Sequence, residues 1–235
     1  GTSGAALASG DRSKPELGKA ELDAKLFKAE VRLPDETLED SIEHGTFQDT
    51  IMQLAGERIS LDMEEWVINA DTASADAFLA AGDGAIKAAT SNVVNHGGAA
   101  TSHSLFTSLL KSMPTPFIRN RKNLRFYVSV DSETDYREAL AARGTVFGDA
   151  VSQQDTDLTP FGIPMRDVPV FPENLGGGAN QTVALLTDPK NLNVGVWRKV
   201  KAEVDKDITT GTIILVFTLR VDVKYIHEPA VSKAT

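Results

Sequence analysis

The sequence predicts an α+β fold, in which one long helix and one long β-hairpin accompany a region of shorter helices and strands. Three observations lead to this prediction. Residues 47–69 repeat apolar side chains at spacings of three and four, which is the helical period. Residues 194–205 and 212–225 alternate apolar and polar side chains, which is the strand period. Residues 73–189, between helix and hairpin, alternate helix-like and strand-like segments.

The long helix follows Thr46, which is a suitable capping residue, and a shorter helix is predicted before it from Pro34 to Gly45. The apolar positions of the long helix form one stripe, namely Phe47, Ile51, Leu54, Ala55, Ile59, Met63, Trp66 and Val67. Gly56 lies within this helix and costs about 1 kcal/mol relative to alanine. We therefore expect Gly56 to serve close packing. Residues 18–33, ahead of both helices, are expected to be extended.

The middle of the chain is expected to contain short elements that alternate in type. These are helices over 102–113 and 132–144 and strands over 123–130 and 182–189. Gly144 is expected to cap the second helix. Residues 161–173 are predicted to be extended, but Pro164, Pro169 and Pro172 lack the N–H that a central strand donates. We therefore expect this segment at a sheet edge or in crossing segments.

The C-terminal hairpin is longer than a compact core of this size requires. At about 3.3 Å per residue, each strand spans roughly 35 Å, whereas common strands have about five to six residues. The turn "DKDITTG" is polar and ends in Gly211, and Arg198 is the one charged residue on the apolar face of the first strand. The alternation alone equally allows a hairpin at the edge of a sandwich.

Composition excludes several classes of protein and of site. The 235 residues, 41% of them hydrophobic, are enough for a sizeable core. Because there is no cysteine, disulfides, thiolate metal sites and cysteine nucleophiles are excluded. A net charge of −9 argues against affinity for a phosphate backbone. No apolar run approaches the length of a membrane span, and "GTSGAALASGDRSK" lacks the apolar core of a signal peptide and is expected to be flexible.

A search for catalytic, cofactor or metal motifs finds none that we would assign. The histidines are His44, His96, His103 and His227. Gly97 and Gly98 argue against one helix that would carry two of them. Neither "GDGAIK" nor "GGGAN" has the glycine spacing and context of a phosphate or dinucleotide loop, and no G-x-S-x-G elbow occurs. The acids near residue 131 suit a helix start, and "RNRK" suits a solvated loop. Catalytic, cofactor-binding and metal residues are therefore predicted to be none.

Three segments in this order resemble a known family. They are "LPDETLEDSIEHGTFQDTIMQLAGERISLDMEEWVINAD", "FGIPMRDVPVFPE" and "LLTDPKNLNVGVWRKVKAEVDKD…TIILVFTLRVDVKYIHEPAV". Together they are similar to the spine helix, an internal strand and the C-terminal hairpin of the Hong Kong 97-type major capsid protein of tailed bacteriophages. The resemblance runs from about Lys19 onward and rests on the order of the segments, because no single motif is a fingerprint.

The resemblance implies four divisions of the chain. They are 1–33 (E-loop and the strand leading to the spine helix), 34–72 (spine-helix region of the peripheral domain), 73–189 (axial domain of mixed sheet plus helices) and 190–235 (long hairpin of the peripheral domain and C-terminal strand). Residues 144–157 are expected near the centre of a capsomer. The sequence is expected to begin inside the E-loop, without the N-terminal arm.

The function implied by the resemblance is structural. The chain would assemble with copies of itself, as hexamers and pentamers, into the icosahedral head shell of a phage, in the virion, after assembly in the host cytoplasm. Portal, scaffolding and decoration proteins are further partners that the family suggests. The shell would enclose double-stranded DNA without sequence-specific binding, and no enzyme activity, cofactor or membrane is expected. Some relatives crosslink through Lys, Asn and Glu, but "TGTIILVFTLRVD" has neither Asn nor Glu.

Contacts between subunits are expected at the two segments that a lone chain anchors least. In the N-terminal segment the candidates are Asp11, Arg12, Lys14, Glu16 and Lys19, and at the hairpin turn they are Asp205, Lys206, Asp207, Thr209 and Thr210. Ordering each residue costs about 1–2 kcal/mol. Because residues 1–25 hold few large apolar side chains, we expect a neighbouring subunit to order them.

Two other functions remain open from the sequence. The first is an encapsulin-type nanocompartment shell, which would enclose an enzyme in place of DNA. The second is a monomeric α+β binding module or enzyme. A plain flexible tail is the alternative for the N-terminal segment.

Overall fold

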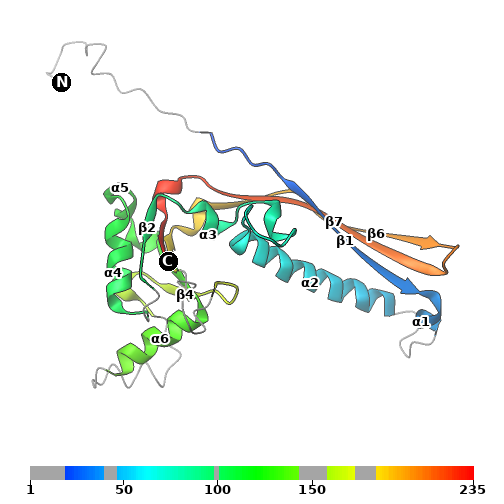
Figure 1. Ribbon diagram of the computed structural model, residues 1–235, viewed down its shortest axis with the longest axis horizontal. Coiled ribbons are helices and arrows are strands. Elements are labelled where there is room, and N and C mark those ends of the chain that lie inside the picture. The colour runs from blue at the N-terminus through cyan, green and yellow to red at the C-terminus, as the bar shows by residue number, and fades with distance from the viewer. Residues whose placement is uncertain (1–18, 40–46, 98–100, 143–157, 173–183) are drawn as a thin grey trace, which may run out of the picture.

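The computed structural model describes residues 19–39, 47–97, 101–142, 158–172 and 184–235. In these ranges the chain forms two separate sheets. Figure 1 shows one sheet and the longest helix as an extended arm, with the shorter elements gathered at the other end. The predicted mixture of helix and sheet is thus divided between two unlike regions.

The arm is built on a three-stranded antiparallel sheet in the order β1-β7-β6. Its strands are β1 (Lys25–Pro34), β6 (Leu192–Asp207) and β7 (Thr212–Tyr225). The hairpin predicted from alternation is confirmed, since β6 and β7 pair with each other along their length. Strand β1 confirms the extended segment before the helices, and it pairs with the far side of β7. The central position of β7 explains its buried apolar residues.

Helix α2 (Phe47–Asn69) has the predicted bounds and lies along one face of this sheet (Figure 1). Trp66 is fully buried and meets the ring of Phe27 edge-on at a centroid distance of 5.1 Å. Farther along the helix, Ile51 and Ile59 pack with Phe217. Leu54, however, is 55% exposed. Its placement in the buried stripe was wrong, because successive helical residues turn by about 100° and Leu54 faces solvent.

The tip of the hairpin contacts the start of α1 (Asp35–Glu39). Gly211 has φ +60°, which suits the turn predicted there. Its carbonyl accepts a hydrogen bond from the Asp35 N–H at 2.9 Å. The predicted continuation of the short helix to Gly45 lies outside the described residues beyond Glu39.

The second sheet has five short strands in the order β2-β8-β5-β3-β4. They are β2 (Asn92–Val94), β3 (Arg125–Val128), β4 (Met165–Asp167), β5 (Ala184–Thr187) and β8 (Ser232–Ala234). Strand β4 occupies the edge, as its neighbouring prolines predicted. Strands β2 and β8 are parallel, as are β3 and β4, whereas β5 is antiparallel to both of its neighbours.

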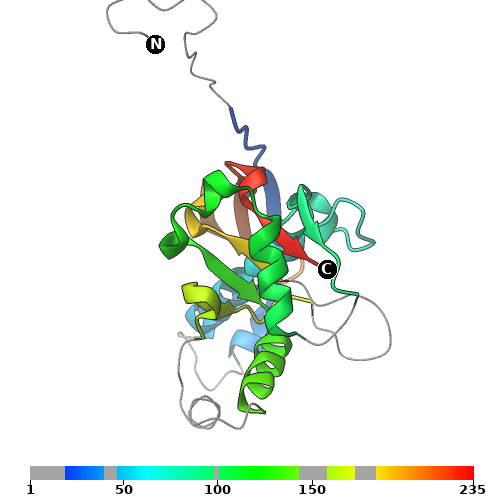
Figure 2. The same cartoon turned by 90° about the vertical axis from the view of Figure 1, so that its left-hand side faces the viewer.

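Helices cover the second sheet and close its core (Figure 2). They include α3 (Ala85–Ala88), α4 (His103–Ser112), α5 (Thr115–Ile118) and α6 (Val130–Ala141). Phe106 of α4 is fully buried between Phe126 of β3 and Tyr136 of α6, with both ring centroids 5.0 Å away. Helix α6 begins earlier than predicted because Ser129 caps it, accepting a hydrogen bond from the Ser132 N–H. The predicted cap at Gly144 lies outside the described residues.

Within the described parts of the chain, five single turns of 3-10 helix link these elements. They are η3 (Leu79–Ala81), η4 (Arg121–Asn123), η5 (Pro160–Gly162), η6 (Pro189–Asn191) and η7 (Glu228–Ala230). In η7 the Glu228 carboxylate accepts hydrogen bonds from the N–H groups of Thr90 and Ser91, both at 2.7 Å, and from both hydroxyls. It therefore joins the segment before β8 to the segment before β2.

Glycines mark where the chain packs closely, but not where we expected. A Cβ added at Gly56 would meet open space, so the assignment of this residue to close packing was wrong. At Gly84 a Cβ would lie 2.7 Å from the Ile68 carbonyl oxygen, and at Gly82 it would lie 2.7 Å from the Trp66 ring. These two glycines let the chain return against the end of α2.

Candidate assembly surfaces

Strand β6 presents most of its length to solvent. No residue of the strand is buried. Its valines face the same side as the buried residues of β7, yet Val196 is 53% exposed and Val204 is 48% exposed. The indole of Trp197 is 79% exposed. An apolar strand face of this length without a cover is the kind of surface that protein partners bury.

Two bulges in β6 explain the charged exception in its alternation. The register passes from Val196 opposite Val221 to Arg198 opposite Arg220, and then to Lys201 opposite Thr218. Each step places one extra residue on β6, and an extra residue moves the side chains that follow to the other face. Arg198 therefore shares the face of Arg220 and leaves the valine face. The charged exception at Arg198 was the one sign of these bulges in the sequence pattern, but it did not show where the register shifts.

The hairpin tip is partly engaged within its own chain. The Lys206 ammonium lies 2.6 Å from the Asp35 carboxylate, and the Asp205 carboxylate accepts a hydrogen bond from the Lys206 N–H. Asp207 accepts from the Thr209 N–H at 2.9 Å. Hydrogen bonds from Thr210, and then from Thr209, lower the pKa of Asp207. Ile208, between Asp207 and Thr209, is 88% exposed, which leaves a large apolar side chain at the end of the arm.

The sequence-predicted contact residues are only partly within the described ranges. Lys19 is exposed and forms an ion pair with Glu21. Asp11, Arg12, Lys14 and Glu16 lie outside the described residues. The apolar residues of β6 were not among the predicted contacts, because the prediction chose charged and polar side chains. The sequence signal that would have pointed to them is apolar alternation along a strand that is too long for one helix to cover.

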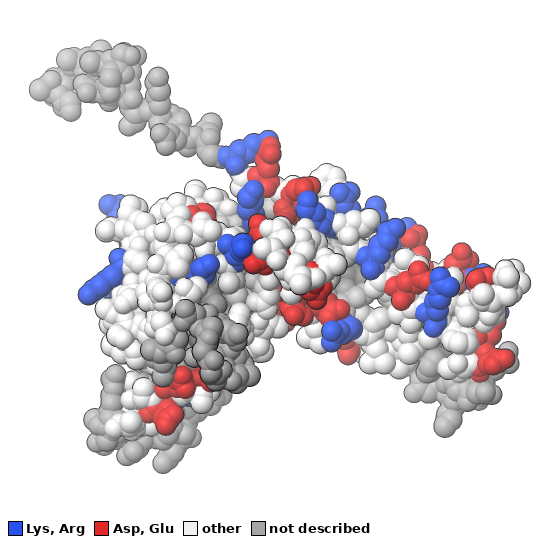
Figure 3. Space-filling model, viewed as in Figure 1, with Lys and Arg blue, Asp and Glu red and all other residues white. Residues whose placement is uncertain are grey.

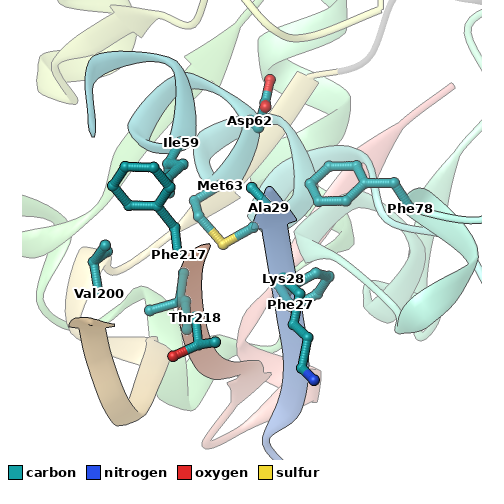
Figure 4. Close-up of a pocket in the computed structure, with 11 residues that line it drawn as sticks. Phe27, Lys28, Ala29, Ile59, Asp62, Met63, Phe78, Val200, Phe217 and Thr218 are labelled. Atoms are coloured by element: carbon teal, nitrogen blue, oxygen red, sulfur yellow. The ribbon is translucent and has the colours of Figure 1, made fainter. Parts of the chain in front are cut away.

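A small pocket opens between α2 and the sheet (Figure 4). Its volume is about 150 Å³, and its walls are mainly apolar. Phe27, Phe217 and Met63 line it, together with Phe78 and Val200. Val200 lies between Arg198 and Lys201, where the register of β6 shifts, so the pocket borders the bulged part of this strand.

Charges are interspersed along the visible face of the arm in Figure 3, with basic and acidic residues side by side. The exposed ion pairs of the arm include Arg58–Asp62 within α2 and Lys201–Glu203 within β6. Such pairs are each worth only about 0–1 kcal/mol, so they favour solubility and alignment more than stability.

The described residues contain no group of three His, Asp or Glu side chains placed to hold a metal ion. His103 instead contacts aromatic residues. Its Nδ1 lies 3.2 Å from the Tyr136 hydroxyl oxygen, and its ring centroid lies 4.4 Å from that of Phe161. Among the described helices, none is long and apolar enough to span a membrane.

Known proteins resemble this chain in sequence and in fold. No protein-family model matches the chain. A curated relative from Bacillus subtilis (strain 168), "Putative prophage capsid protein YqbE", is 36% identical over 234 residues, which cover 98% of this chain and 75% of the relative. The chain belongs to the family of phage capsid proteins. The predicted recognition is thereby confirmed.

Solved shell structures share the fold. The capsid of a native GTA particle matches with a TM-score of 0.64 and 14% identity, over 99% of this chain and 80% of its own. The capsid of Microbacterium phage Oxtober96 matches with 0.62 and 16%, over 100% and 79%. The SrpI encapsulin of Synechococcus elongatus PCC 7942 matches with 0.65 and 12%, over 90% and 73%. At these identities the matches establish the α+β, Hong Kong 97-type capsid fold.

Proposed function

We propose that this capsid protein is the structural major shell protein of a tailed phage or prophage, and that hexamers and pentamers of it form an icosahedral head. The observation that carries the proposal is the open face of β6. Val194, Val196, Val200 and Val204 are each about half exposed, although the β7 residues opposite Val194, Val196 and Val204 are buried. A neighbouring subunit that covers this face would gain about 25 cal/mol for each Å² of apolar surface removed from water.

Introducing negative charge into this face tests the proposal. Val196→Asp and Val204→Asp together should leave the folded subunit intact, because both side chains are already about half exposed. They should prevent particle formation, because a shell contact would then bury two unpaired carboxylates. Asn193→Asp is the matched control for Val196→Asp alone, since each adds one negative charge at an exposed position of β6 and Asn193 lies off the valine face. Particles of the double variant in normal yield, seen by negative-stain microscopy, would refute the role of this face.

The divisions 1–33, 34–72, 73–189 and 190–235 are part of the same proposal, as are contacts made by the N-terminal segment and the hairpin turn. Ile208 at the tip supports the turn as a contact, because it is 88% exposed. Hydrogen exchange of residues 1–25 tests the N-terminal part. Exchange should slow on assembly, whereas equally fast exchange in subunits and particles would favour a plain tail.

The shell is proposed to enclose double-stranded DNA without binding it tightly, and to need no enzyme activity. The net charge of −9 supports weak binding. Isolated subunits should bind duplex DNA more weakly than about 1 µM at physiological salt. A salt-sensitive dissociation constant below that value would overturn this point. Boiled particles should run as one monomer band, because the strand 210–222 lacks Asn and Glu.

An encapsulin-type shell is the second candidate, and the structural match to SrpI is the observation that favours it. Particle contents distinguish the two. Nuclease-treated particles from phage-producing cells should contain DNA, with portal, scaffolding or decoration proteins as minor bands. Particles that instead hold one cargo enzyme and no DNA would favour the encapsulin. Assembly in the host cytoplasm is proposed for either.

A further inference from the structure

The sheet face that points away from α2, which we call the outer sheet face, gathers cations around one buried hydroxyl. Thr218 and Lys28 project from the sheet on the side opposite to Phe217, which points toward α2 (Figure 4). Lys28 of β1 and Lys201 of β6 are the register partners of Thr218. In the next row of this face Arg198 lies opposite Arg220. Four cationic side chains therefore occupy two adjacent rows.

The nearby carboxylates are largely committed to other partners. Glu30 pairs with Arg32, and Asp222 accepts a hydrogen bond from the Asp23 N–H at 2.6 Å. Glu203 pairs with Lys201 itself, whose ammonium lies 2.5 Å away, and so offsets one of the four cations. The excess is carried by Lys28, Arg198 and Arg220. Within the described ranges no ion pair or hydrogen bond engages the side chain of Lys28 or of Arg198. The two rows therefore keep an excess of positive charge.

Two polar atoms in these rows are shielded from water and have no partner. Thr218 is only 7% exposed, and its Oγ1 makes no hydrogen bond. The Nε of Arg220 is likewise unpartnered, while its Nη2 donates to the Ala24 carbonyl at 3.1 Å. Buried polar groups in native proteins nearly always have a partner, so two such atoms on one face call for an acceptor.

The bulges of β6 build this arrangement at a cost. Without the first bulge, alternation would leave Arg198 on the face of Val196, away from Arg220. Like charges directly opposite one another destabilise a sheet. A group that accepts hydrogen bonds and carries negative charge between them would offset that repulsion. Arginine is suited to such a group, because its planar fork matches the spacing of carboxylate or phosphate oxygens.

We infer that Arg198, Arg220, Lys28, Lys201 and Thr218 form a binding site for an oxyanion on the outer sheet face. The two guanidinium groups hold the oxyanion, the lysines neutralise it, and the Thr218 hydroxyl donates to it. The flexible side chains of the lysines, on either side of Thr218, admit it. The oxyanion is either an inorganic phosphate-like ion or a carboxylate of a neighbouring copy, and the second source rests on the proposed shell function.

Inorganic phosphate is the probe, added to the full chain as dispersed subunits in chloride buffer. The Nε–H signal of Arg220 in a nitrogen-edited NMR spectrum reports directly on the unpartnered atom. It should shift and saturate below about 10 mM phosphate. Thr218→Val should weaken phosphate binding about tenfold, since it removes one hydrogen bond to a charged group. This variant should stay folded, because the lost hydroxyl has no partner in the free chain.

Arg198→Gln removes one positive charge from the site and should also weaken phosphate binding. Its matched control is Lys206→Gln, which removes one positive charge from β6 at a position that pairs with Asp35 on the other sheet face. It should bind phosphate as the unaltered chain does. A shift that does not saturate, or one that Thr218→Val leaves unchanged, would overturn the site. These measurements need no particles, so they stand apart from the shell function.

Assembly kinetics then distinguish the two sources. If a neighbour's carboxylate is the ligand, phosphate should slow assembly over the same concentrations that move the Arg220 signal. If a free ion is the ligand, assembly should proceed unchanged while the site is occupied.

Discussion

The two sheets of this capsid protein differ in how much of their surface the chain itself covers. Every residue of β5, in the five-stranded sheet, is buried, whereas no residue of β6, in the three-stranded sheet, is. Strands of three or four residues suffice in the first because helices close over them and share their core. The three-stranded sheet has strands of 10, 16 and 14 residues and a single long helix on one face. The uncovered length of β6 is the surface that we propose neighbouring subunits cover.

Truncating a side chain should give the largest difference in unfolding free energy between the two sheets. Phe126→Ala removes a fully buried ring from β3 and should lower the free energy of unfolding by about 3–5 kcal/mol. Val204→Ala, at the exposed strand β6, should lower it by less than about 1 kcal/mol. Urea unfolding of dispersed subunits measures both. Equal losses would mean that β6 is covered in the free subunit.

Backbone proximity gives the next largest effect. Gly84→Ala would place a Cβ 2.7 Å from the Ile68 carbonyl oxygen and 2.8 Å from the Ala70 nitrogen. Backbone atoms cannot turn aside as a side chain does, so the change should cost about 1–3 kcal/mol. Thermal unfolding of dispersed subunits should show a clearly lowered midpoint. An unchanged midpoint would show that the end of α2 can yield.

Acidification should weaken the contact between η7 and the segment before β2. Burial acts to raise the pKa of Glu228, but hydrogen bonds from Ser91 and Thr90 outweigh it, and the pKa is lowered. The stabilisation is therefore fully present above the unfolded-state pKa of about 4.3 and is lost as pH falls through the lower folded value.

Glu228→Gln should accordingly cost about 1–2 kcal/mol at pH 7, discounted for partial exposure, and progressively less below about pH 4. Chemical unfolding across this pH range tests the difference. Glu57→Gln is the control, because Glu57 is exposed on α2. A difference between Glu228→Gln and the unaltered chain that stays constant down to about pH 2 would contradict the assignment.

The smallest expected effect is a gain. Gly56→Ala meets open space in α2 and should raise the unfolding free energy by about 0.5–1 kcal/mol, because alanine orders more readily in a helix. Calorimetry of free subunits measures this gain. A loss of particles in a variant with raised stability would show that a neighbour packs against Gly56.

Sequence periodicity predicted α2 and the hairpin well because both are long, and many repeats of a pattern outweigh local exceptions. It predicted Leu54 wrongly, since apolar character does not reveal how much of a helix the sheet can cover. The pairing of β1 with β7, and of β8 with β2 and β5, joins distant segments and leaves no local signal. The bulges beside Arg198 were hidden because they depend on the partner strand.

The strand order of the five-stranded sheet also constrains when that sheet can form during synthesis. Strand β8, at residues 232–234, lies between β2 and β5, which precede it by about 140 and 48 residues. During synthesis at about 5–20 residues per second, β2 must therefore wait for it, whereas β5 can already pair with β3. The hairpin at 192–225 is translated before β8, and its local pairing can form first. The three-stranded sheet, which we propose contacts neighbouring subunits, can thus pair its strands before the order β2-β8-β5 is complete.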